Sequence, residues 1–427
     1  MRERLQQCPH LLRATARTSS FIRAHLHLEK DQSADGLRGW AALNVFASHF
    51  LLALFPLGFV HFFPWVAQSG AKASHFDGML SAPFLSILWN GRFPVSVFFV
   101  LSGYVLTNAF VDLRDIDALR SKVARRYFRL GIPVFFSVML AYSLMKLGAY
   151  HSVETVQVTS SAWLASQILQ GPPDLGAALK EGLYESIFTI KHAYNPALWT
   201  MRIEFFGSML IFSYRALAWP GRREIVAAAI YVALVFFLDP MLWPLYLAFL
   251  LGSHIGDMPR PKTAIHAWAA AVVGIALGSV DQSAIFAWFH LMPLEFETRS
   301  ALYSVLGGAL LVYGVRGGAF KRLLLGRVSQ FLGRVSYSLY LVHLPIIFSV
   351  GCGLFNWMHS EKGFARESAA AMSLALTTMC VIAVAWIFER LVDSPAIRFS
   401  KAIFRPSPIA RLRKRGSTSD VAEPTPR

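Results

Sequence analysis

Residues 35–49 read Asp35-Gly-Leu-Arg-Gly-Trp-Ala-Ala-Leu-Asn-Val-Phe-Ala-Ser-His49, and they open the first long apolar run of the chain, which continues to residue 60. A helix needs about 20 mostly apolar residues to cross the hydrocarbon core of a bilayer. Eleven positions separate Arg38 from His49, so both lie on nearly one helix face, about 16 Å apart along the axis. The stretch predicts a membrane-spanning helix with a cation at its cytoplasmic end and an imidazole near mid-membrane.

Similar apolar windows recur along the rest of the chain. The 427 residues are 55% hydrophobic and only 15% charged, with a mean hydropathy of +0.46, whereas soluble domains are about one quarter charged. The predicted spans are 40–60, 93–111, 130–150, 197–214, 224–239, 241–256, 264–281, 300–315, 336–357 and 368–389. We therefore expect an all-α, polytopic membrane helix bundle of about ten transmembrane helices.

The basic residues predict the orientation of the bundle. The net charge is +16, but the Lys and Arg side chains fall between apolar runs and do not form the polar surface of a nucleic-acid binder. Cytoplasmic loops are enriched in Lys and Arg, and an inside amino terminus places 32 of the 41 on the cytoplasmic side. The pattern predicts a multi-pass protein of the plasma or cytoplasmic membrane with both termini in the cytoplasm.

The organisation along the chain is simple. We expect a basic cytoplasmic tail over 1–32, a transmembrane domain over 33–400 and a disordered cytoplasmic tail over 401–427. The outward segment 151–196 is either a set of short helices packed over the outer mouth or a loose connector. Three widely spaced cysteines show no metal or disulfide pattern, so neither a metal site nor a permanently bound cofactor is expected.

Ionisable residues inside a membrane are costly and mark candidate functional sites. Arg38 is also consistent with an interface anchor, and His49 with a buried imidazole bonded to a neighbouring helix. Arg202 and Glu204 are the only charges in their span and point about 200° apart, so each should have its own partner.

Two further groups stand out. Ser336, Tyr340 and His343 share one face of the ninth predicted span, although a Tyr at the start of a span is also typical of the interface belt. The basic loop of 125–129 runs straight into the third span. This basic stretch either fixes the topology and attracts lipid headgroups, or it forms an anion site. The second interpretation is chemically reasonable because arginines bind phosphates through two parallel hydrogen bonds.

These motifs, in this order, resemble the membrane acyltransferase 3 family. The first span, 35–49, is similar to its Arg-x10-His signature, and Phe98-Phe-Val-Leu-Ser-Gly-Tyr-Val105 resembles its second-span segment. Arg125-Arg-Tyr-Phe-Arg-Leu-Gly-Ile-Pro133 resembles its basic loop, and residues 199–204 resemble its W-x-x-x-x-E motif. Residues 331–345 are similar to its late-span hallmark. The resemblance covers about residues 33–400.

The resemblance implies an integral-membrane O-acyltransferase. Such an enzyme takes an acyl group, commonly acetyl, from cytoplasmic acyl-CoA and passes it to a hydroxyl of a carbohydrate, a lipid-linked glycan or a small metabolite. A hydroxyl must lose its proton to attack a thioester, so His49 is expected to be the general base. His343, Tyr340 and Ser102 are the candidate donors to the oxyanion.

The remaining site residues are expected to bind or position substrates. Arg38 is expected to bind the CoA phosphates or the thioester end, and Asp35 is expected to orient the Arg38 guanidinium. The cluster of Arg125, Arg126 and Arg129 suits the diphosphate and 3′-phosphate. Glu204 either positions the acceptor or tunes His49, and Ser336 is a supporting residue.

Two alternatives stay open at this point. A covalent acyl-enzyme on His49 or Ser102 competes with direct transfer, which needs no dedicated nucleophile. A transporter or glycolipid flippase would use His49, Glu204 and His343 as a proton or substrate path. The basic cluster and Arg38 fall together on the predicted cytoplasmic side, which favours the enzyme.

Overall fold

The structure is a computed structural model of the chain, and it describes residues 31–108, 116–217 and 222–403. Among these residues the fold is helical, with one isolated bridge between Ala67 and Ser161 and no strand. The expected basic tail and carboxyl-terminal tail lie outside the described residues, apart from residues 31 and 32 and the residues 401–403 that end α19.

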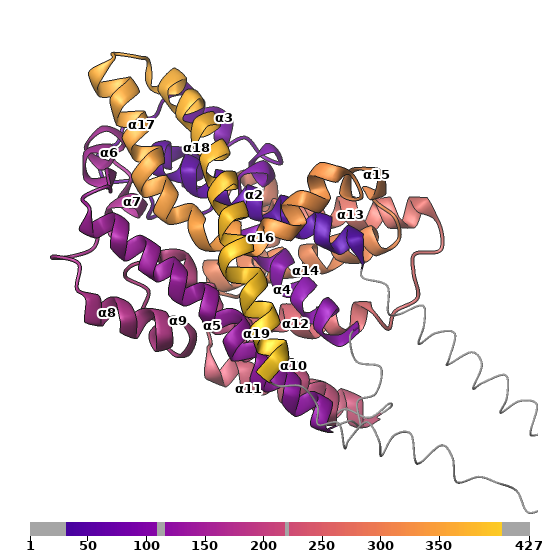
Figure 1. Ribbon diagram of the computed structural model, residues 1–427. Coiled ribbons are helices and arrows are strands. Elements are labelled where there is room, and N and C mark those ends of the chain that lie inside the picture. The colour runs from indigo at the N-terminus through magenta and orange to yellow at the C-terminus, as the bar shows by residue number, and fades with distance from the viewer. Residues whose placement is uncertain (1–30, 109–115, 218–221, 404–427) are drawn as a thin grey trace, which may run out of the picture.

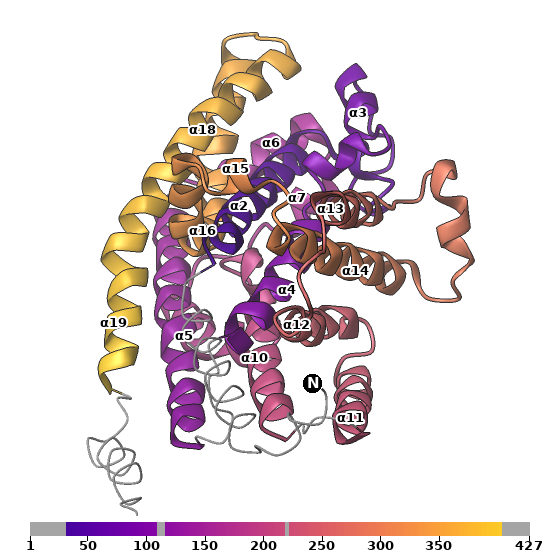
Figure 2. The ribbon, with the colours of Figure 1, turned by 90° about the vertical axis from the view of Figure 1, so that its right-hand side faces the viewer.

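Each of the ten predicted windows coincides with a helix of the structure (Figures 1 and 2). The helices are α2 (Gln32–Leu54), α4 (Arg92–Asn108), α5 (Ile116–Lys146), α10 (Trp199–Leu217), α11 (Arg222–Leu238), α12 (Trp243–Ile255), α13 (Ala264–Gly278), α14 (Phe296–Arg316), α16 (Arg327–Ile346) and α18 (Arg366–Phe388). Four of the described helical stretches are long and apolar enough to cross a membrane, at Gln32–Leu54, Ser121–Lys146, Arg327–Glu361 and Arg366–Ile403. Four shorter helices are also apolar: Arg92–Thr107, Glu224–Phe237, Trp243–Ile255 and Ala264–Gly278.

The sequence predicted a basic loop before the third span, and this prediction is wrong for the part of the segment that the structure describes. Residues 116–129 are already helical and form the first turns of α5. Alternating Arg, Lys and apolar residues at 120–130 suit a helix as well as a loop, because Arg and Lys are good helix formers. The basic residues therefore lie on defined faces of one helix.

The two longest apolar stretches near the carboxyl end are compound helices. From α16 the chain passes through a π-helical turn (Ile347–Gly351), α17 (Cys352–Asn356) and a second π-helical turn (Trp357–Glu361). From α18 it passes through a third π-helical turn (Glu389–Asp393) into α19 (Ser394–Ile403). Figure 2 shows α18 and α19 as one long rod that runs beside α5.

The segment 151–196 packs on the bundle as short helices and is not a loose connector. It contains α6 (Ser152–Thr159), α7 (Ala162–Ser166), α8 (Leu175–Lys180), the π-helical turn Glu181–Glu185 and α9 (Ser186–Phe188). The Ser161 hydroxyl donates to the Leu52 carbonyl of α2 at 3.2 Å. Burial raises the pKa of Glu181, and the N–H groups of residues 193–195 oppose that shift by donating to its carboxylate.

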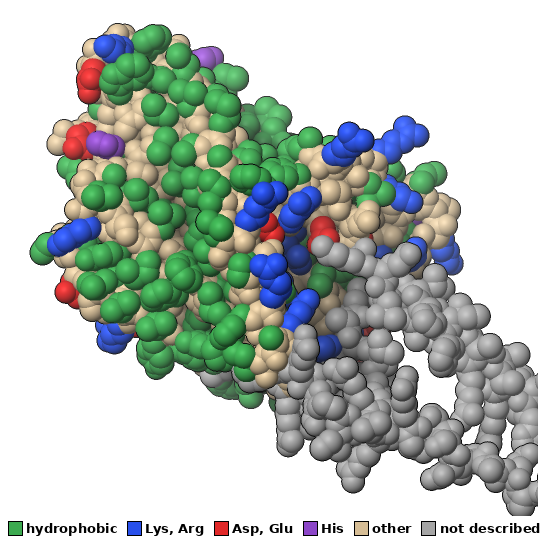
Figure 3. Space-filling view, viewed as in Figure 1, with side chains coloured by type: hydrophobic (Ala, Val, Ile, Leu, Met, Phe, Trp, Pro, Cys, Tyr) green, Lys and Arg blue, Asp and Glu red, His purple; other side chains and the backbone are tan. Residues whose placement is uncertain are grey.

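The remaining described elements are short connections. They are the 3-10 helices Pro56–Phe59, Leu85–Leu88, Pro196–Leu198 and Ala284–Leu291, together with α3 (His75–Leu80) and α15 (Lys321–Leu324). Figure 3 shows hydrophobic side chains over much of one face, while Lys and Arg side chains gather beside α15 and α19. An apolar outer surface of this extent is typical of a protein that contacts lipid.

Glycines set the close crossings of the central helices. A Cβ at Gly39 of α2 would lie 2.5 Å from the Gly333 nitrogen of α16, and a Cβ at Gly36 would meet the Leu324 carbonyl. A Cβ at Gly103 of α4 would meet the backbone of α12, and a Cβ at Gly252 of α12 would meet the backbone of α4. Small residues at such positions let helix backbones approach in a membrane, where packing drives association. The crossing of α2 and α16 brings their functional residues together.

Candidate active site

Two histidines that are 294 positions apart in the sequence form a hydrogen-bonded pair. His49 of α2 and His343 of α16 meet with 3.1 Å between His49 Nδ1 and His343 Nε2. His343 is fully buried, and its Nδ1 lies 2.7 Å from the Tyr340 carbonyl oxygen. The sequence proposed a role for each histidine, and the structure brings the two into contact.

The Tyr340 carbonyl determines the direction of hydrogen bonding in this pair. A carbonyl oxygen only accepts, so His343 Nδ1 carries a proton and donates it. In a neutral imidazole the other nitrogen is then an acceptor, so His343 Nε2 accepts from the Nδ1–H of His49. His49 Nε2 is therefore left with its lone pair, which is the state that a general base requires.

Trp163 stacks on the His49 ring, and sequence reasoning missed this residue. It lies on α7, and its ring stacks on the imidazole with centroids 5.3 Å apart. Its side chain is only 7% exposed. A single Trp in a connecting segment carries no signal of its own, because its position depends on how that segment folds back onto α2.

A cavity of about 140 Å³ lies near the histidine pair, between α2, α4, α5, α10 and α16. By the usual measure such a volume holds roughly ten water molecules. Its charged lining residues are Arg38, Arg126, Arg129 and Glu204, and its polar ones are Ser102, Thr200, Tyr337 and Tyr340. Its other lining residues are apolar: Val95, Phe98, Phe99, Val105, Leu106, Leu130 and Met201.

Tyr340 connects the cavity to the histidines. Its ring lines the cavity and lies 5.5 Å from the His343 ring, centroid to centroid. Its hydroxyl donates to the Ala197 carbonyl at 3.0 Å and lies 2.9 Å from the Thr200 hydroxyl. The two imidazoles lie just beyond this ring and do not line the cavity themselves.

Glu204 is the centre of a buried polar network. Its carboxylate accepts from the Ser102 hydroxyl at 2.8 Å and forms an ion pair with Arg126. Arg126 also donates from Nε to the Ser208 hydroxyl at 2.9 Å. Arg202, two positions before Glu204, pairs instead with Asp239 at 3.3 Å. The prediction of separate partners for the two charges of α10 is confirmed.

The expected cluster of three arginines does not act as one group. Arg126 and Arg129 are three positions apart and line the cavity, but Arg125 is rotated by about 100° and donates to Ser121 on its own helix. Of the three arginines, the structure therefore brings Arg126 and Arg129, and not Arg125, to the cavity. Arg129 is exposed, whereas Arg126 is buried against Glu204.

Arg38 and the supporting residues have distinct positions. Arg38 lines the cavity and lies 3.8 Å from Asp35, which agrees with the orienting role expected for that carboxylate. Ser336 donates to the Gly333 carbonyl at 2.9 Å, so its hydroxyl acts within α16. Across the described ranges, no group of three or more His, Cys, Asp and Glu side chains has the arrangement of a metal site.

Asn195 fixes the start of α10 against α16, and sequence reasoning gave it no role. Its side-chain amide donates to the Leu341 carbonyl at 2.8 Å, and its Oδ1 accepts from Ala197 N at 3.3 Å. The Asn-Pro dipeptide is a recognisable helix-start signal. That signal marks the helix boundary, whereas the contact with Leu341 depends on tertiary packing.

Comparison with known proteins agrees with this geometry. An acyltransferase-domain family profile matches residues 31–390. The chain is 25% identical to acyltransferase clz18 of Cochliobolus lunatus, over 88% of this chain and 96% of that protein. It is 24% identical to O-acetyltransferase PaAT-1 of Phomopsis amygdali, over 90% of this chain and 86% of that protein. It is 26% identical to acyltransferase MdmB of Streptomyces mycarofaciens, over 86% and 91% of the two chains.

No solved structure matches the chain. The family match, however, covers most of the sequence, and it includes the helices that carry the histidine pair and the cavity. The protein is therefore an acyltransferase that belongs to the acyltransferase 3 family.

Proposed function

We propose that this protein is an integral-membrane O-acyltransferase that moves an acetyl group from cytoplasmic acyl-CoA to a hydroxyl of a carbohydrate, a lipid-linked glycan or a small metabolite. The observation that carries the proposal is the His49–His343 pair, next to a cavity whose lining includes Arg38 and Arg129. One relative is named an O-acetyltransferase, which supports acetyl as the group transferred.

In this proposal His49 is the general base. Its Nε2 takes the proton of the acceptor hydroxyl as the oxygen attacks the thioester carbonyl. The tetrahedral intermediate then collapses, the carbon–sulfur bond breaks, and the CoA thiolate leaves. The thiolate takes the proton from the imidazolium, which restores neutral His49. His343 holds the imidazole in the required tautomer through the bond to His49 Nδ1.

Of the candidate oxyanion donors, Tyr340 suits the geometry best. Both His343 nitrogens are already bonded, and the Ser102 hydroxyl donates to a carboxylate. Tyr340 lines the cavity, and its hydroxyl donates to the neutral Ala197 carbonyl and lies 2.9 Å from the Thr200 hydroxyl. We propose that this hydroxyl turns to the oxyanion, where a hydrogen-bond donor is worth about 2.7–4 kcal/mol.

The same contacts favour direct transfer over an acyl-enzyme. An activated serine needs a base within hydrogen-bond reach. The base within reach of Ser102 is the Glu204 carboxylate, which Arg126 also engages, whereas His49 is bonded to His343. Glu204 in this arrangement holds the walls of the cavity together, which supports positioning and not the tuning of His49.

Arg38 and Arg129 are the proposed ligands of the CoA phosphates. Arg129 is exposed at the edge of the cavity, and Arg38 is held by Asp35. Guanidinium groups bind phosphate oxygens with two parallel bonds, and such bonds are about twice as strong as neutral ones. The donor would then reach the histidine pair through the cavity with its thioester foremost.

We also propose that the ten helices are transmembrane spans with both termini in the cytoplasm. The coincidence of ten apolar windows with ten helices supports the number. The gathering of Lys and Arg side chains beside α15 and α19 supports a common cytoplasmic side for these segments (Figure 3).

A labelled donor tests the proposal directly. Purified protein in nanodiscs is incubated with [14C]acetyl-CoA and a metabolite and glycan extract of the source cells. We expect an acetylated compound that mass spectrometry identifies, and we expect none with His49→Ala that is inserted and folded to the same extent. The proposal fails if label stays on CoA. In proteoliposomes, uptake of extract compounds without acetylation would instead indicate transport.

A further inference from the structure

The cavity has two chemically different ends. Ser102 and Glu204 are bonded to each other, and Arg126 joins them there. Phe98 precedes Ser102 by one helical turn, and Thr200 precedes Glu204 by one turn. The Tyr340 hydroxyl is 2.9 Å from the Thr200 hydroxyl, and the Tyr340 and Phe98 rings are 5.9 Å apart. One turn away from the charges, the cavity is therefore lined by a layer of mostly apolar side chains.

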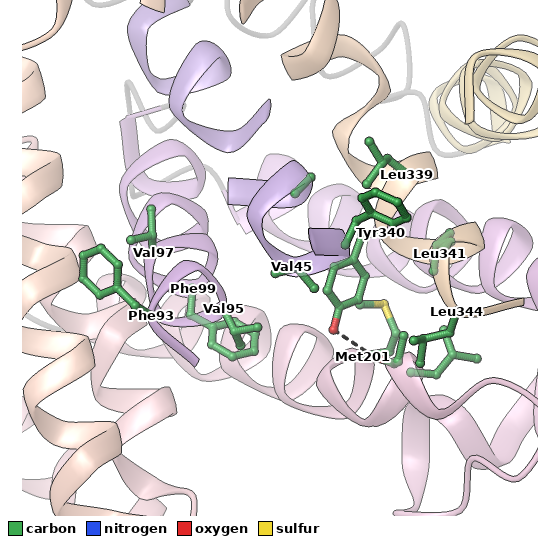
Figure 4. Close-up of a cluster of buried hydrophobic side chains, with 14 of the residues drawn as sticks. Val45, Phe93, Val95, Val97, Phe99, Met201, Leu339, Tyr340, Leu341 and Leu344 are labelled. Atoms are coloured by element: carbon green, nitrogen blue, oxygen red, sulfur yellow. Dashed lines mark hydrogen bonds between the residues drawn. The ribbon is translucent and has the colours of Figure 1, made fainter. Parts of the chain in front are cut away.

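Three side chains from three helices close that layer. Phe98 of α4 meets the edge of Tyr340 of α16 in a T-shaped contact, and Met201 of α10 is 5% exposed. Figure 4 shows Met201 beside the Tyr340 ring, with Val95 and Phe99 on the neighbouring helix. We name these three residues, Phe98, Met201 and Tyr340, the closing layer. It lies on the side of the cavity next to the histidine pair.

We propose that the closing layer is the acyl-binding end of the cavity and that Met201 sets the longest acyl chain that the enzyme accepts. The inference rests on the proposed acyl-CoA donor. Phosphates held by Arg38 and Arg129 leave the thioester and its acyl group at the opposite, apolar end. Tyr340 is fixed by two hydrogen bonds, so the unbranched and flexible Met201 is the wall that a substitution can move most simply.

Binding of S-alkyl thioether analogues of CoA tests this inference without needing an acceptor. The probes are CoA, S-ethyl-CoA, S-butyl-CoA and S-octyl-CoA, and their affinities are measured by calorimetry on protein in nanodiscs. For the natural sequence we expect S-octyl-CoA to bind at least tenfold more weakly than S-butyl-CoA. In Met201→Ala three side-chain atoms are lost, which makes room for two or three methylenes.

Each buried methylene is worth about a fourfold change in affinity. We therefore expect Met201→Ala to raise the affinity for S-octyl-CoA, relative to the affinity for S-butyl-CoA, by roughly 10- to 60-fold. Met201→Phe should act in the opposite direction and weaken S-butyl-CoA relative to S-ethyl-CoA. Met209→Ala is the matched control, because Met209 lies on the same helix but does not line the cavity.

The outcomes separate the two proposals. A shift in chain-length preference with Met201→Ala and not with Met209→Ala supports the inference. If both Met201 variants bind CoA and keep the chain-length preference of the natural sequence, the inference is overturned and the proposed donor is not. If the natural sequence binds none of the four probes, the proposed acyl-CoA donor is wrong, and the inference is overturned with it.

Discussion

His343 fixes the tautomer of His49, and its replacement by two different amides tests this role. In His343→Asn the side chain ends near the position of imidazole Nδ1, so it still reaches the Tyr340 carbonyl but not His49. In His343→Gln the amide oxygen extends to about the position of Nε2, which is 3.1 Å from His49 Nδ1 in the structure. Both replacements are buried polar amides of similar size. They differ in whether an acceptor remains for the His49 N–H.

The expected loss follows from what the lost acceptor does. In His343→Asn, His49 loses the side-chain acceptor that holds its lone pair on Nε2. General-base catalysis contributes about 10²–10⁴ to a rate, and each tenfold change is about 1.4 kcal/mol of barrier. We expect His343→Asn to lower kcat by 10²–10⁴ and His343→Gln to stay within about tenfold of the natural enzyme.

The assay is release of CoA thiol from acetyl-CoA by protein in nanodiscs, with water or the identified acceptor as nucleophile. The KM for acetyl-CoA should change little in either variant, because Arg38 and Arg129 are untouched. Equal kcat values for the Asn and Gln variants would refute the tautomer argument. So would an effect confined to KM. Melting temperatures of the two variants show whether they fold equally well.

Three further predictions concern two residues that line the cavity and one close helix crossing. Arg129→Ala should raise the KM for acetyl-CoA about tenfold or more with little change in kcat, because a charge-assisted bond to phosphate is worth about 1.5–3 kcal/mol; Arg125→Ala should leave both constants unchanged. Glu204→Ala should lower the free energy of unfolding by about 3–5 kcal/mol, because it leaves the buried Arg126 charge without its partner. The double variant Glu204→Leu with Arg126→Met should recover most of that loss in a thermal unfolding assay. Gly252→Ala should cost about 1–3 kcal/mol and reduce the monodisperse fraction on size exclusion, because its Cβ would meet the Val100 carbonyl of α4.

Each of these has a result that would contradict it. Equal KM values for the Arg129 and Arg125 variants would remove Arg129 from the donor site. If the double variant at 126 and 204 is no more stable than Glu204→Ala, the broken ion pair is not the source of the lost stability. For Gly252 the control is Gly78→Ala, whose Cβ would meet no atom within 4 Å. Equal behaviour of the two glycine variants would contradict the close-crossing argument.

The sequence predicted local features well, because these depend on neighbours along the chain. Hydropathy located all ten helices, and the 200° between Arg202 and Glu204 required different partners. Loop and helix were confused at 116–129, since basic residues suit both. Predicted orientation and span number rest on charge and hydropathy and stay predictions.

The partners of the site residues depended on the tertiary structure. Nothing local to His49 selects His343 as its neighbour, and the choice follows from small residues such as Gly39 and Gly333 that let two helices cross closely. Likewise Arg126, and neither Arg125 nor Arg202, meets Glu204 because of how α5 and α10 are rotated against each other.

The sequence by itself therefore determined that this chain forms apolar helices carrying an imidazole and arginines on defined faces, because periodicity and hydropathy are properties of consecutive residues. Only the tertiary structure decided which faces meet. It joined His49 to His343, stacked Trp163 on His49 and brought Phe98, Met201 and Tyr340 from three helices to one cavity. Those contacts span helices distant in sequence, and backbone approach and side-chain packing at the crossings select them.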